Sequence, residues 1–272
     1  MTDRYAVIGN PVAHSRSPEI HAAFARECGA DIEYGRLLAP VARFAETAEA
    51  FRAGGAAGAN VTLPFKLEAF AFAHARTARA ERGRSVNTLH FETNHVVGDN
   101  TDGVGLCRDI EQNIGQPLLG TRILLIGAGG AARAVVGALM DCQPELLAIT
   151  NRTPAKAQAI VDEINVKNML RAVGLTELPK LRFDVLINAT SASLSASLPL
   201  VPLSSFDNNA LAYDMMYGKG LTPFLALAAG TGARTADGIG MLVEQAAEAF
   251  YVWRGVRPST GPVLDLLKQA AR

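Results

Sequence analysis

The sequence predicts an α/β protein of two domains, and two observations support this. Short apolar runs alternate with longer segments of helical periodicity along most of the 272 residues; the run at residues 5–9, for example, precedes a helical pattern at residues 17–29. This alternation is typical of βα units that build a mostly parallel sheet. A second series of the same kind opens at residue 121, after a complete first series, and predicts a second sheet.

The first series predicts three strands followed by a hairpin. Strands are expected at residues 5–9, 33–39 and 58–63, with helical patterns at residues 17–29, 41–55 and from there through Arg82. Two further runs, residues 85–92 and 95–100, flank a turn at Thr93–Asn94. Such closely spaced runs are typical of a hairpin, which we expect at one edge of the sheet.

The second series begins with a helical pattern at residues 103–114. Strands are expected at residues 121–127, 146–150, 184–190 and 210–215. Residues 238–256 carry apolar side chains at helical spacing and form the longest amphipathic pattern in the chain. We expect a first domain at residues 1–102, a second at 103–237, and C-terminal helices at 238–272 that pack back on the first domain.

Composition excludes several classes of protein. Hydrophobic residues make up 49% of the chain, and Lys plus Arg equals Asp plus Glu at 26 each, so the basic excess typical of nucleic-acid binding is absent. Cys28, Cys107 and Cys142 are far apart and form no CxxC pair, which argues against a disulfide framework and against a metal site. The N-terminus lacks an apolar signal sequence and no run resembles a membrane span, so we expect a cytoplasmic protein.

A glycine-rich turn predicts a dinucleotide site in the second domain. Gly127-Ala128-Gly129-Gly130-Ala131-Ala132 fits GxGxxA, directly after a predicted strand and before a predicted helix. The first glycine permits a tight turn, the second lets the backbone approach a pyrophosphate, and the alanine allows close packing of helix on strand. The helix N-terminus then offers free N–H groups to the phosphates. The second domain is therefore predicted to be Rossmann-type.

The residues after the next strand favour NADP over NAD. NAD enzymes place an acid there to bind the ribose 2′-hydroxyl. This chain has Asn151-Arg152-Thr153 instead, followed by Lys156. Arginine and lysine attract a 2′-phosphate, whereas an acid repels it.

Polar loops of the first domain predict the site of a small hydroxylated acid. Ser15 and Ser17, the segment "NVTLPFK" with Lys66, Asn87, and "GDNTDG" with Asp102 are all read as loops that follow strands. In an open parallel sheet, ligands bind outside the carboxyl ends of the strands. Hydroxyls, an amide, an ammonium and a carboxylate suit a polyhydroxylated acid better than an apolar ligand.

The sequence resembles the shikimate dehydrogenase family over its whole length. Ten pieces occur in the family's order: "AVIGNPVAHSRSPEIHAAF", "GANVTLPFK", "SVNT", "GDNTDGVG", "LLIGAGGAAR", "TNRT", "INATS", "YDMMY", "TPFL" and "DGIGMLVEQAAEAF". The resemblance implies reversible NADPH-dependent reduction of 3-dehydroshikimate to shikimate, on the route through chorismate to aromatic amino acids. The expected partners are this small-molecule substrate and NADP, with no nucleic acid and no membrane; a homodimer is compatible with the sequence.

The resemblance also implies the roles of individual residues. Lys66 and Asp102 form the catalytic pair, with the lysine as proton donor to the substrate oxygen. The residues implied for substrate binding are Ser15 and Ser17 at the carboxylate, then Thr62, Asn87 and Gln245, with Tyr217 nearby. Those implied for NADP are Gly127, Ala128, Gly129, Gly130, Ala131, Asn151, Arg152, Thr153 and Lys156, with Met215 and Gly238 toward the nicotinamide.

Several positions depart from the family pattern. They are Ala192, Ser193 and Ala196 after "INATS", Arg84-Ser85 before "VNT" where Gly-Ala is usual, and Leu67 after "PFK" where an acid is usual. These changes are compatible with a divergent paralogue of low activity or shifted substrate. Three alternative functions stay open: a quinate/shikimate or aminoshikimate dehydrogenase of the same superfamily, a non-catalytic NADP-binding sensor, and a methyltransferase that uses the glycine loop for S-adenosylmethionine. The Lys66 and Asp102 pair argues against the sensor, and the basic "TNRT" argues against the methyltransferase.

Overall fold

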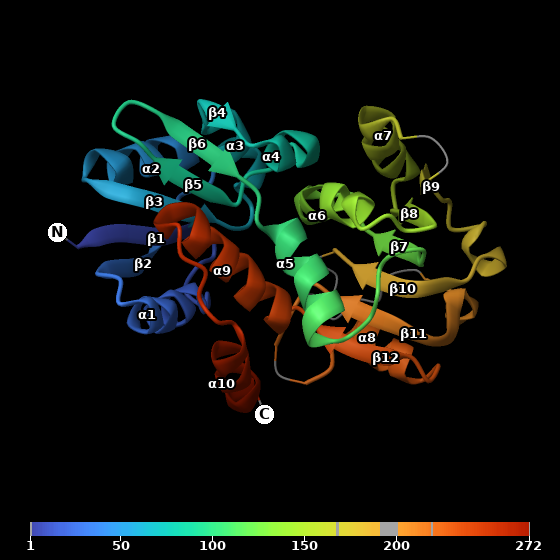
Figure 1. Cartoon of the computed structure of the whole chain (residues 1–272). Helices are drawn as coiled ribbons and strands as arrows, with labels where there is room; N and C mark the ends of the chain where they lie inside the picture. The colour runs from blue at the N-terminus through green and yellow to red at the C-terminus, as the bar shows by residue number, and fades with distance from the viewer. Residues whose placement is uncertain (1, 167–168, 191–200, 219, 272) are drawn as a thin grey trace. The chain divides into compact units, whose positions relative to one another are not determined.

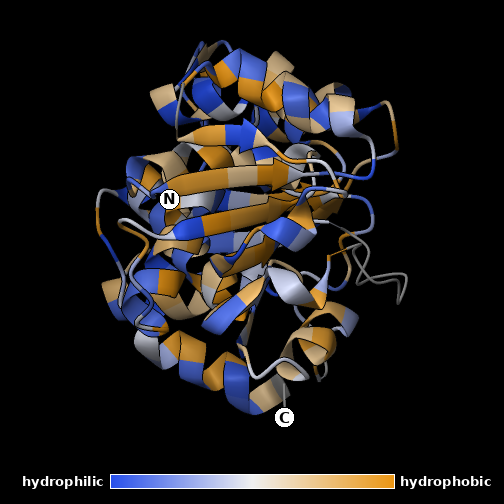
Figure 2. Cartoon of the chain, turned by 90° about the vertical axis from the view of Figure 1, so that its right-hand side faces the viewer, coloured by the Kyte–Doolittle hydropathy of each residue, from blue (hydrophilic) through white to orange (hydrophobic). Residues whose placement is uncertain are grey.

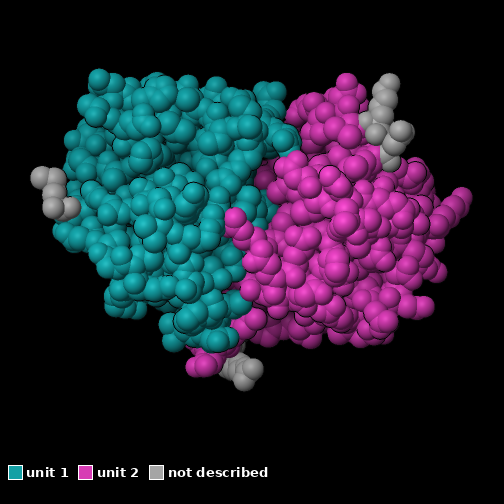
Figure 3. Space-filling model, in the orientation of Figure 1, with its two compact units in different colours: residues 1–105, 242–266 teal, residues 106–241, 267–272 magenta. Residues whose placement is uncertain are grey.

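The computed structural model describes residues 2–166, 169–190, 201–218 and 220–271. They form two six-stranded sheets with helices on both faces, which confirms the predicted two-domain α/β class (Figure 1). The chain divides into two compact units, residues 1–105 with 242–266 and residues 106–241 with 267–272 (Figure 3). Each unit is described by itself below.

The first sheet has the strand order β2-β1-β3-β5-β6-β4. Its strands are β1 (Asp3–Gly9), β2 (Ile32–Leu38), β3 (Ala56–Val61), β4 (Ala75–Arg76), β5 (Thr88–Phe91) and β6 (Val96–Asp99). The helices between them are α1 (Ser17–Cys28), α2 (Phe44–Ala53), α3 (Lys66–Phe72) and α4 (Ala78–Gly83). Only β5 runs against its neighbours β3 and β6. Every other pairing in this sheet is parallel.

The second sheet is parallel throughout, in the order β12-β11-β10-β7-β8-β9. Its strands are β7 (Arg122–Ile126), β8 (Leu146–Thr150), β9 (Leu170–Ala172), β10 (Phe183–Asn188), β11 (Phe206–Asp214) and β12 (Arg234–Asp237). The chain moves outward from β7 to β9 and then returns to β10 on the other side of β7. This reversal is the topological switch point at which doubly wound sheets bind dinucleotides.

The remaining elements connect and cover the sheets. They are α5 (Asp102–Arg108), a π-helical turn (Asp109–Asn113), α6 (Gly130–Asp141), α7 (Pro154–Ile164), short 3₁₀ turns (Leu178–Lys180 and Leu203–Ser205), α8 (Pro223–Ala229), α9 (Ile239–Arg254) and α10 (Gly261–Ala271).

Three details differ from the sequence-based expectations. The hairpin is confirmed as β5–β6, but it does not lie at the sheet edge, because the two-residue strand β4 pairs with β6 on its outer side. The helix expected at residues 103–114 is α-helical only to Arg108 and then widens into the π-helical turn. The strands β4, β9 and β12 were not predicted, since two to four residues are too few to show a period.

Neighbouring residues of the second sheet pack into different cores. Ile123 and Leu125 of β7 belong to one buried cluster, and Leu124 and Ile126 belong to another. A strand with both faces buried carries a continuous apolar run, which is why "ILLI" shows no alternation. In Figure 2 the central strands are largely orange, whereas the helices around them alternate between orange and blue.

Part of the C-terminal segment belongs to the first unit. Residues 242–266, which include most of α9, cluster with residues 1–105. The ring of Trp253 stacks on Tyr5 with centroids 4.5 Å apart, and its indole N–H donates to the carbonyl of Leu89 at 3.0 Å. Gly58 of β3 leaves room for this ring, since a Cβ there would lie 2.7 Å from the indole nitrogen.

An aromatic cluster of the first unit contains a buried histidine. The imidazole of His21 on α1 is fully buried and stacks on the ring of Tyr34, with centroids 4.2 Å apart. Burial disfavours the charged imidazolium and lowers the pKa of His21 to about 3, which Asn60 opposes only in part. This histidine is therefore neutral in the folded protein throughout the physiological range.

We predict that His21 makes stability fall in mild acid. Between the ordinary pKa of 6.5 and the folded value of about 3, only the unfolded chain takes up the proton, so the free energy of unfolding falls as pH decreases. From pH 6.5 to pH 5 the loss should be about 2 kcal/mol from this residue. Denaturant unfolding at pH 7 and pH 5 should show a smaller difference in His21→Gln than in the wild type; equal differences would contradict the assignment.

Candidate active site

The ammonium of Lys66 forms a shielded ion pair. Lys66 is the first residue of α3, after β3, and Asp102 is the first residue of α5, after β6. The lysine Nζ donates to Asp102 Oδ2 at 2.6 Å, and the two side chains are only 15% and 7% exposed. Lysines are rarely this shielded unless they are paired. The lysine is therefore not an ordinary solvated residue at the mouth of a strand.

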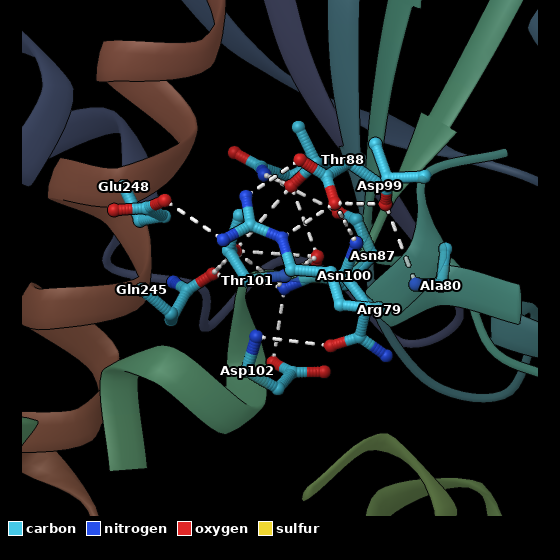
Figure 4. A network of polar contacts seen from close by, with 12 residues as sticks. Arg79, Ala80, Asn87, Thr88, Asp99, Asn100, Thr101, Asp102, Gln245 and Glu248 are labelled. Carbon is cyan, nitrogen blue, oxygen red and sulfur yellow. Dashed lines mark hydrogen bonds and ion pairs between the residues drawn. The ribbon is translucent and has the colours of Figure 1, made fainter. Parts of the chain in front are cut away.

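The side-chain amide of Asn87 joins Asp102 to two other segments. Its Nδ2 is 3.0 Å from Asp102 Oδ1, 2.9 Å from Thr101 Oγ1 and 3.2 Å from Gln245 Oε1. Its Oδ1 accepts from the backbone N–H of Thr101 at 2.8 Å and from the hydroxyl of Thr88 at 2.9 Å. Figure 4 shows Asn87 between the 99–102 turn and Gln245 on α9. The structure thus brings Lys66, Asp102, Asn87 and Gln245 together.

One expectation about this site is wrong in detail. Asn87 precedes strand β5, whereas the sequence was read as placing each of the polar loops after a strand. Because β5 is antiparallel to β3, with Asn60 opposite Thr88, the start of β5 lies beside the end of β3. Asn87 therefore reaches the edge of the sheet where β3 ends, because it stands at the start of an antiparallel strand.

The two serines lie in the loop after β1, at the start of α1. The hydroxyl of Ser15 donates to Ser17 Oγ at 3.2 Å, and the guanidinium of Arg36 holds the carbonyl of Ser15 at 2.6 and 2.9 Å. Ser17 is the first residue of the helix. A helix N-terminus with hydroxyls beside it favours an anion such as a carboxylate.

Thr62 follows β3 directly and is held against the end of β1. Its backbone N–H donates to the carbonyl of Ile8 at 2.9 Å. Gly9 has no room for a Cβ, because that atom would overlap the methyl group of Thr62. The hydroxyl of Thr62 therefore lies at the same carboxyl edge of the first sheet as Lys66.

The second unit carries the glycine turn between β7 and α6. Gly127 has φ +116°, a conformation that favours glycine, and its N–H donates to the carbonyl of Thr150 at 2.8 Å. A Cβ added at Gly129 or Gly130 would meet no described atom within 4 Å, so the space beside the backbone is open. Ala128 and Ala131 complete the turn, and α6 begins at Gly130 with its N–H groups free for phosphates.

The strand next to β7 ends in the basic segment. Ile126 of β7 pairs with Thr150 of β8, so Gly127 and Asn151 leave neighbouring strands side by side. The amide of Asn151 donates to the carbonyl of Thr153 at 2.9 Å and shapes this loop. The side chains of Arg152, Thr153 and Lys156 are exposed. Among the described residues, no salt bridge engages Arg152 or Lys156, so both cations are available to a phosphate.

On the other side of the switch point, Met215 and Gly238 lie at the same edge. Strand pairing aligns Ile126 with Asn188, Asn188 with Asp214, and Asp214 with Asp237. Met215 and Gly238 each follow one of these strands, and a Cβ at Gly238 would overlap the carbonyl of Met215. Tyr217 is half-buried in the loop after Met215 and belongs to this unit.

Sequence reasoning missed the polar side chains that support these loops. Asp214 accepts from Asn188 Nδ2 at 3.1 Å, from the N–H of Met216 at 3.0 Å and from the hydroxyl of Thr222 at 2.6 Å. In the first unit, Tyr34 donates to Asn60 Oδ1 at 2.7 Å, and Asn60 Nδ2 bonds Thr88 Oγ1 at 3.1 Å. The available signal was a polar residue inside an apolar strand, such as Asn60 in "GANVTL".

The departures from the family pattern have structural correlates at two places. Arg84 has φ +44°, in the region that favours the glycine usual there, and ends α4. Ser85 is fully buried, and its carbonyl accepts from Asn100 Nδ2 at 3.0 Å. Leu67 is 53% exposed. Ala192, Ser193 and Ala196 lie outside the described residues.

No group of three or more His, Cys, Asp or Glu side chains among the described residues is arranged to hold a metal ion. None of the helices in the described part of the chain is long and apolar enough to cross a membrane.

Comparison with known proteins identifies the family. Family models match the shikimate dehydrogenase substrate binding domain at residues 7–89, shikimate / quinate 5-dehydrogenase at 109–198, and the shikimate 5'-dehydrogenase C-terminal domain at 238–268. A shikimate dehydrogenase (NADP(+)) of Nitrosospira multiformis is 53% identical, covering 99% of this chain and 98% of that protein.

Two solved structures share the whole fold. An Ael1 enzyme from Pseudomonas putida has a TM-score of 0.92 at 48% identity, over 98% of both chains. The shikimate 5-dehydrogenase of Thermus thermophilus, in complex with NADP(H) and shikimate, has a TM-score of 0.88 at 32% identity, over 99% of this chain and 100% of that one. With three family models in order and a relative of 53% identity over almost its full length, the chain belongs to the shikimate dehydrogenase family.

Proposed function

We propose that the protein catalyses the reversible NADP-dependent reduction of 3-dehydroshikimate to shikimate, within the biosynthesis of chorismate and aromatic amino acids. The observation that carries the proposal is the shielded pair of Lys66 and Asp102, with Asn87 and Gln245 beside it, in a member of this family. Residues 1–102 are proposed to bind substrate and residues 103–237 to bind NADP, with residues 238–272 returning to the substrate domain.

In the proposed substrate site, each polar group has a separate task. Ser15 and Ser17 bind the substrate carboxylate at the N-terminus of α1. Thr62, Asn87 and Gln245 hydrogen-bond the hydroxyls, and Tyr217 is proposed as a further substrate contact. A set of hydroxyls and amides suits a ring with several hydroxyl groups, because each buried polar group needs a partner.

In the proposed cofactor site, the residues present fit NADP. The backbone of Gly127 to Ala131 would hold the phosphates, because the structure leaves space beside Gly129 and Gly130. Arg152 and Lys156 bind the 2′-phosphate, with Asn151 and Thr153 shaping their loop. Met215 and Gly238 border the nicotinamide.

The proposed mechanism assigns the proton to Lys66. Bound NADPH supplies the hydride that reduces the carbonyl carbon. The Lys66 ammonium donates a proton to the oxygen that becomes a hydroxyl, and in the reverse direction the neutral amine takes it back. Asp102 holds the lysine Nζ through the 2.6 Å contact, and its second oxygen is held by Asn87. These contacts support the proposal, because they hold the lysine Nζ in one position.

An absorbance assay at the nicotinamide band tests this function directly. Shikimate and quinate are each offered with NADP and with NAD. We expect rapid reduction of NADP with shikimate and slower turnover in the other three combinations. A preference for quinate would support the alternative of a shifted substrate, to which the departures at Arg84, Ser85 and Leu67 point. Binding of NADP without turnover of either acid would support the sensor.

Location and assembly are also proposals. We propose a cytoplasmic protein, and its three free cysteines suit a reducing compartment. For assembly we propose a homodimer, which light scattering would show as twice the chain mass of 28.7 kDa. A mass equal to one chain would rule the dimer out at that concentration.

We predict that Lys66→Ala lowers kcat far more than it raises KM. Removal of a general acid costs roughly 10²- to 10⁴-fold in rate, while the hydroxyls and amides that bind substrate remain. Asp102→Asn should also slow turnover, because the lysine loses its anchor. The double variant should be little worse than Lys66→Ala, since the two residues act as a unit. Steady-state kinetics with shikimate and NADP measure this; an unchanged kcat in Lys66→Ala would remove the lysine from the chemistry.

We predict that Arg152→Ala selectively weakens NADP. Loss of a charge-assisted hydrogen bond to the 2′-phosphate should weaken NADP binding roughly 10- to 100-fold. Binding of NAD, which lacks this phosphate, should change less than twofold. Dissociation constants for both cofactors, measured by titration of intrinsic or cofactor fluorescence, give the comparison. Equal losses for the two cofactors would show that Arg152 is structural.

A further inference from the structure

The guanidinium of Arg79 lies close to the proposed active site and bonds to two carboxylates from different parts of the chain. Arg79, on α4, donates through Nε and Nη2 to both oxygens of Asp99, at 2.7 and 2.6 Å. Its Nη1 donates to Glu248 Oε1 on α9 at 2.8 Å. Asp99 is 4% exposed and Glu248 is 5% exposed. Figure 4 shows Arg79 between Asp99 and Glu248, close to Asn87. We call these three residues the Arg79 triad.

The Asp99 side of the triad fixes the turn that carries Asp102. Asp99 Oδ1 also accepts from the hydroxyl of Thr77 at 2.5 Å and from the backbone N–H of Asn100 at 2.7 Å. Asn100 Oδ1 in turn accepts from the N–H of Asp102 at 3.1 Å. Three successive hydrogen bonds therefore lead from the Arg79 guanidinium, through Asp99 and Asn100, to Asp102, the partner of Lys66.

The Glu248 side of the triad fixes the turn of α9 that carries Gln245. Residues three apart on a helix lie on the same face, so Glu248 and Gln245 point toward the same part of the first unit. The helix is already in close contact there, since a Cβ at Gly105 would lie 2.7 Å from the backbone nitrogen of Gln245. A rotation of α9 about its axis would move Gln245 away from Asn87.

We propose that Arg79 is a positioning residue for the reaction, which sets Asp102 through Asp99 and Gln245 through Glu248. This inference rests on the proposed function. A planar guanidinium with five N–H donors can serve both carboxylates at once, which a lysine ammonium cannot do with the same geometry. Without it, the nearly buried Asp99 loses its cation and Glu248 keeps only its pair with Arg257, whose Nη2 lies 2.7 Å from Oε2. An uncompensated buried charge, as at Asp99, strongly favours rearrangement. The 99–102 turn and helix α9 would then no longer be held by the same side chain.

The two sides of the triad predict different kinetic changes. Glu248→Gln leaves the Asp99 side intact and weakens the α9 side, including the pair of Glu248 Oε2 with Arg257 at 2.7 Å, so KM for shikimate should rise several-fold with kcat changed less than twofold. Arg79→Gln disturbs both sides, so KM should rise and kcat should also fall, with kcat/KM reduced roughly 10- to 100-fold. Arg79→Lys keeps the charge and should recover part of this loss. The dissociation constant for NADP should stay the same in all three variants, because the cofactor residues belong to the other unit.

Arg52→Gln is the matched control. Arg52 makes a comparable bidentate pair with Glu49 in the same unit, at 2.7 and 3.0 Å, on helix α2 and outside the site. Its kinetics should stay within twofold of the wild type. Arg79→Gln that behaves like this control would overturn the inference, whereas a wild type inactive toward shikimate would overturn the proposed function itself.

A double-mutant cycle separates positioning from general stability. If Arg79 acts through Gln245, the increases in KM caused by Arg79→Gln and by Gln245→Ala should not be additive. The reason is that Gln245→Ala removes the side chain that Arg79→Gln would misplace. Additive effects, together with a lowered thermal midpoint, would show a purely structural role. If Arg79→Gln does not fold, Glu248→Gln and Arg79→Lys carry the test, and wild-type KM in both would overturn the inference.

Discussion

The first unit depends on one buried side-chain amide, that of Asn87. A buried amide must find partners for both its N–H₂ group and its oxygen, because an unsatisfied polar group in the interior costs about 1–3 kcal/mol. Here those partners come from strand β5, from the 99–102 turn and from helix α9. Segments more than 150 residues apart are therefore fixed at one point. The proposed catalytic pair of Lys66 and Asp102 is held beside these contacts through Asp102.

The second unit depends on strand register. Its parallel strands end level with one another, so the loops after β7, β8, β11 and β12 open at a single edge. Reversal of strand order between β7 and β10 leaves the glycine turn at the point where no connection crosses the edge. The proposed cofactor specificity lies in one short loop after β8, because Arg152 and Lys156 are exposed there and could meet a phosphate without rearrangement of the core.

The two sites use opposite physical strategies. The residues proposed to bind the cofactor are glycines and exposed cations, which would act through open backbone and through charge. The proposed catalytic residues are shielded and hydrogen-bonded, and several rely on partners that never contact substrate, such as Asp99 and Asn60. Substitution of a supporting residue is therefore expected to disturb the first site more than the second. This difference also explains why the glycine fingerprint is easy to recognise and the first site is not.

By itself, the sequence determined the α/β class, the hairpin, the glycine turn and the basic loop after β8, because each follows from local periodicity or from a short run of residues. Resemblance to a family supplied Lys66 and Asp102 as a pair, 36 positions apart. Only the tertiary structure decided that Asn87 reaches the edge from the start of an antiparallel strand, that the helix after Arg108 widens, and that Arg79 joins Asp99 to Glu248. Those features depend on strand order and helix packing, which bring distant residues together and leave no periodic signal in the chain.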